Sequence, residues 1–340
     1  MDIKESVLSI AADYETVFAD VYGVLFDGAV LYDTALSALE TLKKNGKKVV
    51  LISNSTQISK EARTGYARRG LLQHVHYDEF LTSGEFLNYT IKNRPDKFSE
   101  IVGGKVNTVK CIFLGNANIF KGTHLLRTDA YEADILYVGV PRASYGAVRI
   151  DDIWDDEGNK VNTEDVTDRD WRTLRDSEGR KGLEEFELQL ENCLHLNKTL
   201  LVANPDIFVN SLQEDTSEYI SIITQGAVGA RYEKLGGKVV YFGKPYGGIF
   251  KYAGRLVEAK GPILMVGDSP WTDIAGANAC GIDSALVMTT GIAGEFLKKM
   301  SPYLPLDEKC KKLFGEISPK LTRFTSWATP KYFIKSFGEK

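Results

Sequence analysis

The stretch Thr16-Val17-Phe18-Ala19-Asp20-Val21-Tyr22-Gly23 decides the fold, because an uninterrupted apolar run ends there in a carboxylate. Three more apolar runs also end in polar residues: 48–52 in Ser53-Asn54, 239–242 in Gly243-Lys244, and 262–266 in Gly267-Asp268. Runs rich in β-formers and without polar alternation are typical of strands that are buried on both faces of a parallel sheet. We therefore expect four parallel strands, each followed by residues suited to chemistry.

Helical patterns separate these runs. Leucines at 36, 39 and 42 follow Asp33, a residue suited to the N-cap, and Ser59 and Gly70 are suited to begin and end a second helix. Residues 249–259 predict a further helix before the 262–266 strand. The alternation predicts an α/β fold with a doubly wound, Rossmann-like parallel sheet, in which ligands bind beyond the carboxyl ends of the strands.

The stretch from Ser83 to about Gly236 has strand and helix signals of its own and is too long to be a loop. Its predicted strands are 110–115, 134–140 and 199–203. We expect an inserted α/β domain at 83–236, with the core formed by 1–82 and 237–340.

Two segments have unusual charge. Residues 151–187 contain 14 Asp or Glu against 6 Lys or Arg, which we interpret as a solvated surface excursion. An EF-hand is excluded because Lys160 stands where the turn glycine would be, counted from Asp155. The C-terminal extension from about 295 contains 10 Lys or Arg against 5 Asp or Glu, and its leucines and aromatics suggest that it packs against the core.

Composition excludes several classes of protein. The net charge of −4 and the lack of a basic stripe argue against a nucleic-acid partner. The sequence contains no run of 18 apolar residues that would predict a membrane span, and the N-terminus lacks the pattern of a signal peptide. The four cysteines form no CxxC pair, which favours a reducing compartment. We expect a soluble, cytoplasmic protein.

The polar residues after the four runs suit phosphoryl transfer, which needs a metal ion, a fixed cation and hydrogen-bond donors around the phosphate. Asp20 and Asp268 can ligate Mg²⁺, with Asp273 holding a metal-bound water or orienting its neighbours. Lys244 balances the negative charge, and Ser53 with Asn54 can bind phosphate oxygens. A carboxylate nucleophile at Asp20 would split hydrolysis into two steps through an aspartyl-phosphate.

In this order, these residues resemble the four motifs of the haloacid dehalogenase (HAD) superfamily. The insertion before Lys244 is similar in position to the α/β cap of subclass IIA, the NagD-like and nitrophenylphosphatase-like phosphatases. Asn204-Pro205-Asp206 and the return through Gly226 to Pro245 resemble elements of that group. The resemblance spans about 14–295 and implies a Mg²⁺-dependent phosphatase acting on a small phosphorylated metabolite. Relatives with this cap are frequently homo-oligomers.

One departure from the family pattern concerns Tyr22, where HAD phosphatases usually have a second aspartate that acts as general acid and base. A phenol with a pKa of about 10 is a poor base at neutral pH, so turnover is expected to be slow or narrow. By resemblance, the metal is bound at Tyr22 through the backbone carbonyl, so its side chain should spare the metal site. The alternatives are a catalytically silent protein that binds a phosphorylated ligand or a protein partner, and a HAD chemistry other than phosphate hydrolysis.

Asp27, seven residues beyond Asp20, is a candidate replacement acid. Its position before Gly28 is more typical of a turn. The physiological substrate and the oligomeric state do not follow from the sequence.

Overall fold

The computed structural model describes residues 2–93, 99–100, 109–114, 125–128, 132–139, 142–143, 146–147, 153–154, 157, 159–161, 165–176, 180–212, 219–317 and 329–339. These residues form two compact units. The first comprises 1–53, 59–82 and 243–340, and the second comprises 54–58 and 83–242.

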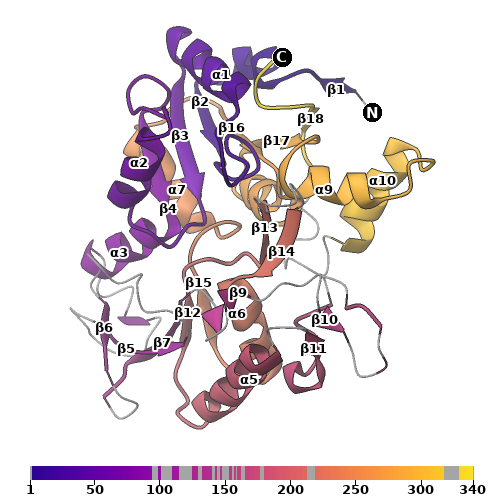
Figure 1. Ribbon diagram of the computed structural model, residues 1–340. Coiled ribbons are helices and arrows are strands. Elements are labelled where there is room, and N and C mark those ends of the chain that lie inside the picture. Colours follow the sequence, from indigo (N-terminus) through magenta and orange to yellow (C-terminus); the bar gives the residue numbers. More distant parts are fainter. Residues whose placement is uncertain are drawn as a thin grey trace. The chain divides into compact units, whose positions relative to one another are not determined.

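The first unit is built on a parallel sheet that, within the described residues, has seven strands (Figure 1). In spatial order the strands are β1 (Ile3–Lys4), β18 (Tyr332–Ile334), β17 (Asp283–Val287), β16 (Ile263–Gly267), β2 (Thr16–Ala19), β3 (Lys48–Ser53) and β4 (Glu79–Thr82). Every neighbouring pair is parallel. The predicted α/β fold with a parallel sheet is therefore confirmed.

Helices cover both faces of this sheet. Because side chains alternate along a strand, Val17 and Ala19 face the apolar cluster that includes residues of α1 (Asp33–Lys44) and α2 (Ser59–Ala67). Phe18 faces the other way, toward Gly254 of α7 (Gly247–Leu256), at a point where a Cβ would lie 4.0 Å from its ring. Burial on both faces explains why the strands are continuous apolar runs.

The remaining helices of the first unit follow β16 and β17. They are a π-helical turn η6 (Pro270–Ile274), α8 (Ala275–Ala279), α9 (Gly291–Lys299), α10 (Leu306–Lys312) and a second π-helical turn η7 (Leu313–Ile317). Short 3-10 turns, η1 (Val7–Ser9) and η2 (Ala11–Asp13), precede β2.

The C-terminal extension packs onto the core, as its apolar residues predicted. Leu313 is fully buried, and β18 pairs with β17 on one side and with β1 on the other. Phe324 and Trp327 lie outside the described residues.

The second unit contains a parallel sheet in the order β15 (Val239–Tyr241), β12 (Leu200–Val202), β7 (Ile135–Val138), β5 (Val109–Leu114) and β6 (Leu125–Arg127). Among its described residues, the helices are α3 (Ser83–Asn93), α5 (Arg180–Leu194), α6 (Gln225–Lys234) and the 3-10 turn η5 (Trp171–Thr173). Three two-stranded ladders complete the described part: β13 (Phe208–Leu212) with β14 (Tyr219–Ile223), β8 (Arg142–Ala143) with β9 (Gly146–Ala147), and β10 (Ile153–Trp154) with β11 (Arg175–Asp176).

The expectation that 239–242 is a strand of the core sheet was wrong. β15 pairs with β12, Leu200 beside Val239, and so belongs to the second unit. The chain returns to the first unit at Gly243 and not at 237, because an apolar run does not reveal which of two parallel sheets will pair with it.

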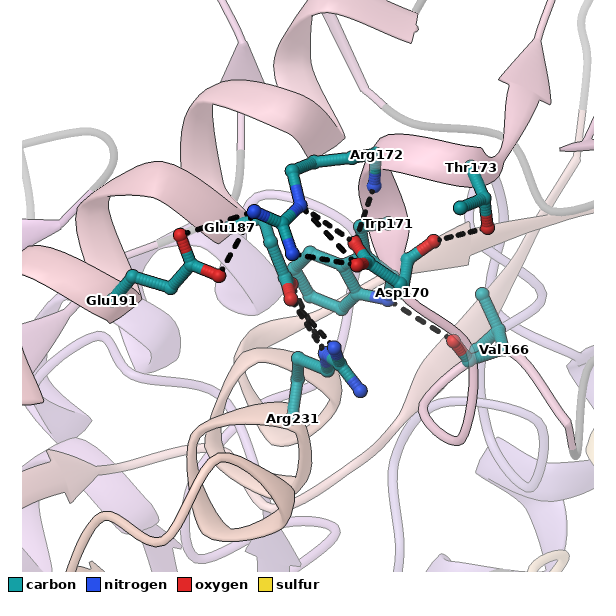
Figure 2. Close-up of polar contacts among 8 residues, drawn as sticks. All are labelled: Val166, Asp170, Trp171, Arg172, Thr173, Glu187, Glu191 and Arg231. Atoms are coloured by element: carbon teal, nitrogen blue, oxygen red, sulfur yellow. Dashed lines mark hydrogen bonds and ion pairs between the residues drawn. The ribbon is translucent and has the colours of Figure 1, made fainter.

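The interpretation of 151–187 as a solvated excursion was also wrong for part of the stretch 165–174, although Asp168 and Arg169 are exposed as expected. Trp171 and Val166 are buried, and the indole Nε1 of Trp171 donates to the Val166 carbonyl at 3.0 Å (Figure 2). Beneath this turn, Arg231 of α6 donates to the fully buried Glu187 of α5 at 2.6–3.1 Å. The acidic residues of this segment thus flank a packed turn.

Two predicted helix starts move by one position. Asp33 is the first residue of α1 and Tyr32 occupies the N-cap. Ser59 is the first residue of α2, and its hydroxyl accepts a hydrogen bond from Thr82 N at 3.3 Å. Gly70, with φ of +96°, follows the end of α2 as predicted.

Candidate active site

The site begins with two neighbouring strands of the first unit. Ala19 pairs with Val266, so that Asp20 and Asp268 emerge from adjacent carboxyl ends of β2 and β16. The amide of Asp20 donates to the Val266 carbonyl at 2.9 Å, which continues the ladder one residue beyond β2. Both carboxylates are almost fully buried.

Lys244 joins this pair to Asp273. Its Nζ lies 2.6 Å from Asp20 Oδ1 and 2.6 Å from Asp273 Oδ1, and it donates to the carbonyl of Ile52 at 3.1 Å. The side chain of Lys244 is only 2% exposed. This contact connects Lys244 to β3 one residue before Ser53, the last residue of that strand.

Asp273 is positioned by the turn that follows β16. Its Oδ2 accepts hydrogen bonds from the amides of Asp268 and Ser269, both at 3.1 Å. The Ser269 side chain in turn accepts from Thr272 N at 3.3 Å and caps η6. Gly267 leaves room for Asp273, because a Cβ at this position would overlap with the carboxylate.

Asp268 is held by elements that we did not predict. Its Oδ2 accepts from Ile292 N at 2.6 Å, at the N-terminus of α9, where the helix dipole favours a carboxylate. Gly23 and Gly291 both have positive φ, and a Cβ on either would overlap with Asp268 Oδ2. The Thr290 hydroxyl donates to Gly23 O at 2.7 Å and connects the two glycine turns.

Burial and neighbouring charges shift the pKa values of Asp20, Asp268 and Lys244. Burial raises the pKa of Asp20 to about 7, although Lys244 opposes the shift, and Asp273 adds to it. Burial, then repulsion from Asp20 and Asp273, raises the pKa of Asp268 well above its usual value. Burial alone would lower the pKa of Lys244, but attraction by Asp20 and Asp273 raises it.

These residues fit a divalent cation. Asp20, Asp268 and Asp273 each offer a carboxylate oxygen, and the three oxygens lie within 4.8 Å of one another. Three buried carboxylates face one lysine, so the cluster has an excess of negative charge that a further cation would neutralise. Oxygen ligands of this kind suit a hard cation.

The other predicted site residues differ in placement. Ser53 is the last residue of β3 and pairs with Thr82 of β4. Asn54 belongs to the second unit, where its Nδ2 donates to Asp206 Oδ1 at 2.9 Å. The Asn54 side chain is therefore engaged by the second unit's own residues.

Tyr22 packs in the turn that follows Asp20. Its ring is 5.8 Å from that of Phe26 in a T-shaped contact, and its hydroxyl lies against Gly28, where a Cβ would overlap with it. Asp27 Oδ1 accepts hydrogen bonds from the amides of Ala29 and Val30 at 2.8 and 2.7 Å. Asp27 therefore forms a turn, as its position before Gly28 predicted.

Tyr66 of α2 is a second phenol near the cluster. Its ring packs against Phe26 and Phe80, with centroids 5.4 and 5.6 Å away. Burial, and then the negative charge of Asp20, raises its pKa. The sequence offered no signal for this residue, because Tyr66 lies on an amphipathic helix where an aromatic residue is ordinary core.

Sequence comparisons identify both segments that carry the site. A model of the haloacid dehalogenase-like hydrolases matches residues 17–118, and a second model, of HAD-hydrolase-like proteins, matches 241–303. No curated protein sequence matches the chain.

Several solved structures have a similar fold. A haloacid dehalogenase-like hydrolase from Brucella suis has a TM-score of 0.64 at 21% identity, with 98% of this chain and 99% of that chain covered. A possible sugar phosphatase of the HAD superfamily from Cytophaga hutchinsonii has a TM-score of 0.65 at 21% identity, covering 100% and 99%. A 4-nitrophenylphosphatase from Thermotoga maritima has a TM-score of 0.56 at 18% identity, covering 96% of each chain.

The matched segments contain Asp20, Lys244, Asp268 and Asp273, which meet in one buried cluster, and the fold extends over the whole length of these structures. In sequence, both segments that carry the cluster resemble haloacid dehalogenase-like hydrolases.

Proposed function

We propose that this protein is a Mg²⁺-dependent phosphohydrolase that acts on a small phosphorylated metabolite through an aspartyl-phosphate on Asp20. The observation that carries the proposal is the Lys244 ammonium shared at 2.6 Å by Asp20 and Asp273, with Asp268 beside them. This arrangement places a buried carboxylate, whose ionised form Lys244 favours, next to a site for a cation. Both are needed to attack a phosphate ester.

In the first step, a carboxylate oxygen of Asp20 attacks phosphorus, and the bond from phosphorus to the ester oxygen breaks. In the second, water attacks the aspartyl-phosphate, which releases inorganic phosphate and regenerates the carboxylate. Lys244 orients Asp20 through Oδ1 and favours its ionised form, since it opposes the rise in its pKa. Asp20, Asp268 and Asp273 would hold Mg²⁺, together with the Tyr22 carbonyl, and the ion would neutralise charge on the phosphoryl group. Ser53 and Asn54 are the proposed phosphate-binding residues.

Tyr22 limits the proton transfers. Neither a phenol packed on Phe26 nor the turn-forming Asp27 supplies the carboxyl group that would protonate the leaving oxygen. General acid–base help is commonly worth about 10²–10⁴-fold, so turnover is slow unless the ester has a good leaving group. The alternative is a catalytically silent protein that binds a phosphorylated ligand or a partner.

The proposed substrate class is supported by two proteins of similar fold, one described as a possible sugar phosphatase and the other as a 4-nitrophenylphosphatase. None of the helices in the described residues has the length and apolarity that a membrane crossing needs. All four cysteines are free, which agrees with the cytoplasmic location that we propose.

The test is hydrolysis of a panel of phosphate esters, including p-nitrophenyl phosphate and sugar phosphates, with and without Mg²⁺. Wild type should release phosphate only with Mg²⁺, and Asp20→Asn should release none. A wild type that is inert on every ester but becomes active as Tyr22→Asp would favour the silent, ligand-binding alternative.

A further inference from the structure

The residues that link the two units form a hydrogen-bonded cluster within the second unit. Asn54 follows Ser53 at one crossing of the chain, and Ser83 begins the second unit at another. The buried Ser83 hydroxyl lies 2.9 Å from the carbonyls of both Asn54 and Ser55. The amide of Gly84 donates to Ser55 O at 3.2 Å, so the two crossings are fastened together.

Close packing leaves this cluster little freedom. A Cβ on Gly84 would overlap with the carbonyl of Thr56. At a third crossing, Phe242 packs against Phe86 of α3, with ring centroids 6.0 Å apart. The segment 54–58 is thus built into the second unit although it lies between β3 and α2 in sequence.

Asp206 is the acidic member of the cluster. Its Oδ1 accepts from Asn54 Nδ2 at 2.9 Å, and Asn54 is 4% exposed. A hydrogen bond to a charged acceptor is stronger than one between neutral groups. The contact spans 152 residues of sequence, so it is a tertiary tie and not a local turn.

The backbone of Asp206 is fixed independently of Asn54. Its amide donates to Asn204 Oδ1 at 2.9 Å, and its carbonyl accepts from Gly226 N at 3.0 Å and from the Thr224 hydroxyl. A Cβ on Gly226 would overlap with the Asp206 carbonyl, so the start of α6 lies directly against this residue. The carboxylate is therefore preorganised for its contact with Asn54.

We propose that Asp206 is a positioning residue for the phosphate-binding motif: it fixes the Asn54 side chain and thereby the backbone that follows Ser53. This inference rests on the proposed function, in which Ser53 and Asn54 bind the phosphate. Asp206 does not touch the reacting atoms. Its loss should weaken phosphate binding and leave the Asp20 chemistry in place.

The experiment compares Asp206→Ala, Asp206→Asn, Asn54→Ala and the Asn54→Ala/Asp206→Ala double variant. The matched control is Asp134→Ala, because Asp134 Oδ2 also accepts one hydrogen bond, from Lys110 N at 2.8 Å, within the second unit. Two readouts are used: KM and kcat for p-nitrophenyl phosphate, and the affinity for inorganic phosphate with Mg²⁺, from thermal-shift titration.

Asp206→Ala should raise KM and weaken the binding of inorganic phosphate, each by about tenfold. This is the change in affinity expected from the loss of one hydrogen bond to a charged group, and kcat should change much less. Asp206→Asn retains an acceptor oxygen and should stay within about threefold of wild type. The double variant should bind phosphate no more weakly than the more impaired of the two single variants, since both substitutions remove the same contact.

The proposal is overturned if Asp206→Ala behaves like Asp134→Ala, or if the effects of the two single variants multiply. The measurement of phosphate binding distinguishes a failure of this proposal from a failure of the proposed function. A wild type that hydrolyses no ester contradicts the phosphatase, yet its phosphate affinity still tests Asp206. A wild type that binds no phosphate would contradict both.

Discussion

No side chain fits between Gly291 and the carboxylate of Asp268, because a Cβ on Gly291 would overlap with Asp268 Oδ2. Gly291→Ala should therefore displace the carboxylate and raise the Mg²⁺ concentration for half-maximal activity by tenfold or more. Gly46→Ala is the matched control, since Gly46 also has a positive φ (+73° against +63°) but nothing within 4 Å. Both variants should lose about 1 kcal/mol of stability from the left-handed backbone. Equal Mg²⁺ dependence in the two would contradict this role of Gly291.

The raised pKa of Asp20 makes the cluster a source of instability without metal. A carboxyl whose pKa rises from 3.8 unfolded to about 7 folded stabilises the fold when protonated, below pH 4. That contribution is lost as the pH rises through 7. At pH 8 without divalent ions, Asp20→Asn should therefore unfold at a higher denaturant concentration than wild type. Its free energy of unfolding should be larger by up to about 4 kcal/mol. At pH 4 the difference should vanish, and a difference that is independent of pH would refute the assignment.

Lys244 is the counterion within the carboxylate cluster, and it is buried. Lys244→Met should abolish hydrolysis and, at pH 8, destabilise the protein by about 3–5 kcal/mol, because it leaves uncompensated buried charge. The loss should shrink at pH 5, where Asp20 is protonated. Urea unfolding at the two pH values measures both effects. An equal loss at both would indicate that Lys244 acts through packing.

Restoring the missing carboxyl group should raise turnover. Tyr22→Asp should increase kcat for esters with poor leaving groups by about 10²-fold or more, with less effect on p-nitrophenyl phosphate, which needs no acid. Tyr22→Phe is the control: it keeps the ring contact with Phe26 and adds no acid. If both variants gain activity equally, the tyrosine hydroxyl obstructs the site.

The ion pair between Glu187 and Arg231 should be important for the stability of the second unit. Glu187→Gln leaves a buried guanidinium without its counterion and should cost about 3–5 kcal/mol. The exposed pair of Lys234 and Asp168, at 2.7 Å, is the control, and Lys234→Gln should cost less than about 1 kcal/mol. Thermal unfolding of the two variants compares them, and similar losses would contradict the prediction.

The sequence was sufficient to predict the parallel core sheet and the position of its polar residues. Asp20 and Asp268 follow strands whose apolar character is unmistakable, and the carboxyl ends of parallel strands lie at one edge. The four residues of the cluster come together in the structure. Their catalytic and metal-binding roles remain predictions.

What the sequence did not reveal depends on pairing between distant segments. The strand β15 pairs with β12 and not with the core, a choice that rests on tertiary packing and not on its own residues. Gly23 and Gly291 are ordinary turn glycines in sequence, and their role follows only from the place of Asp268. Asn54 was predicted from its chain neighbour Ser53, whereas its partner Asp206 lies 152 residues away.

The order of strands in the first sheet has a consequence for biosynthesis. Its central strand β16 begins at Ile263, and β18, which lies between β17 and β1, follows at Tyr332. The whole second unit precedes both in the sequence. During translation the inserted unit can fold while β2, β3 and β4 still lack their neighbour. Until β16 emerges, β2 would present an unpaired strand edge, which favours aggregation of the nascent chain.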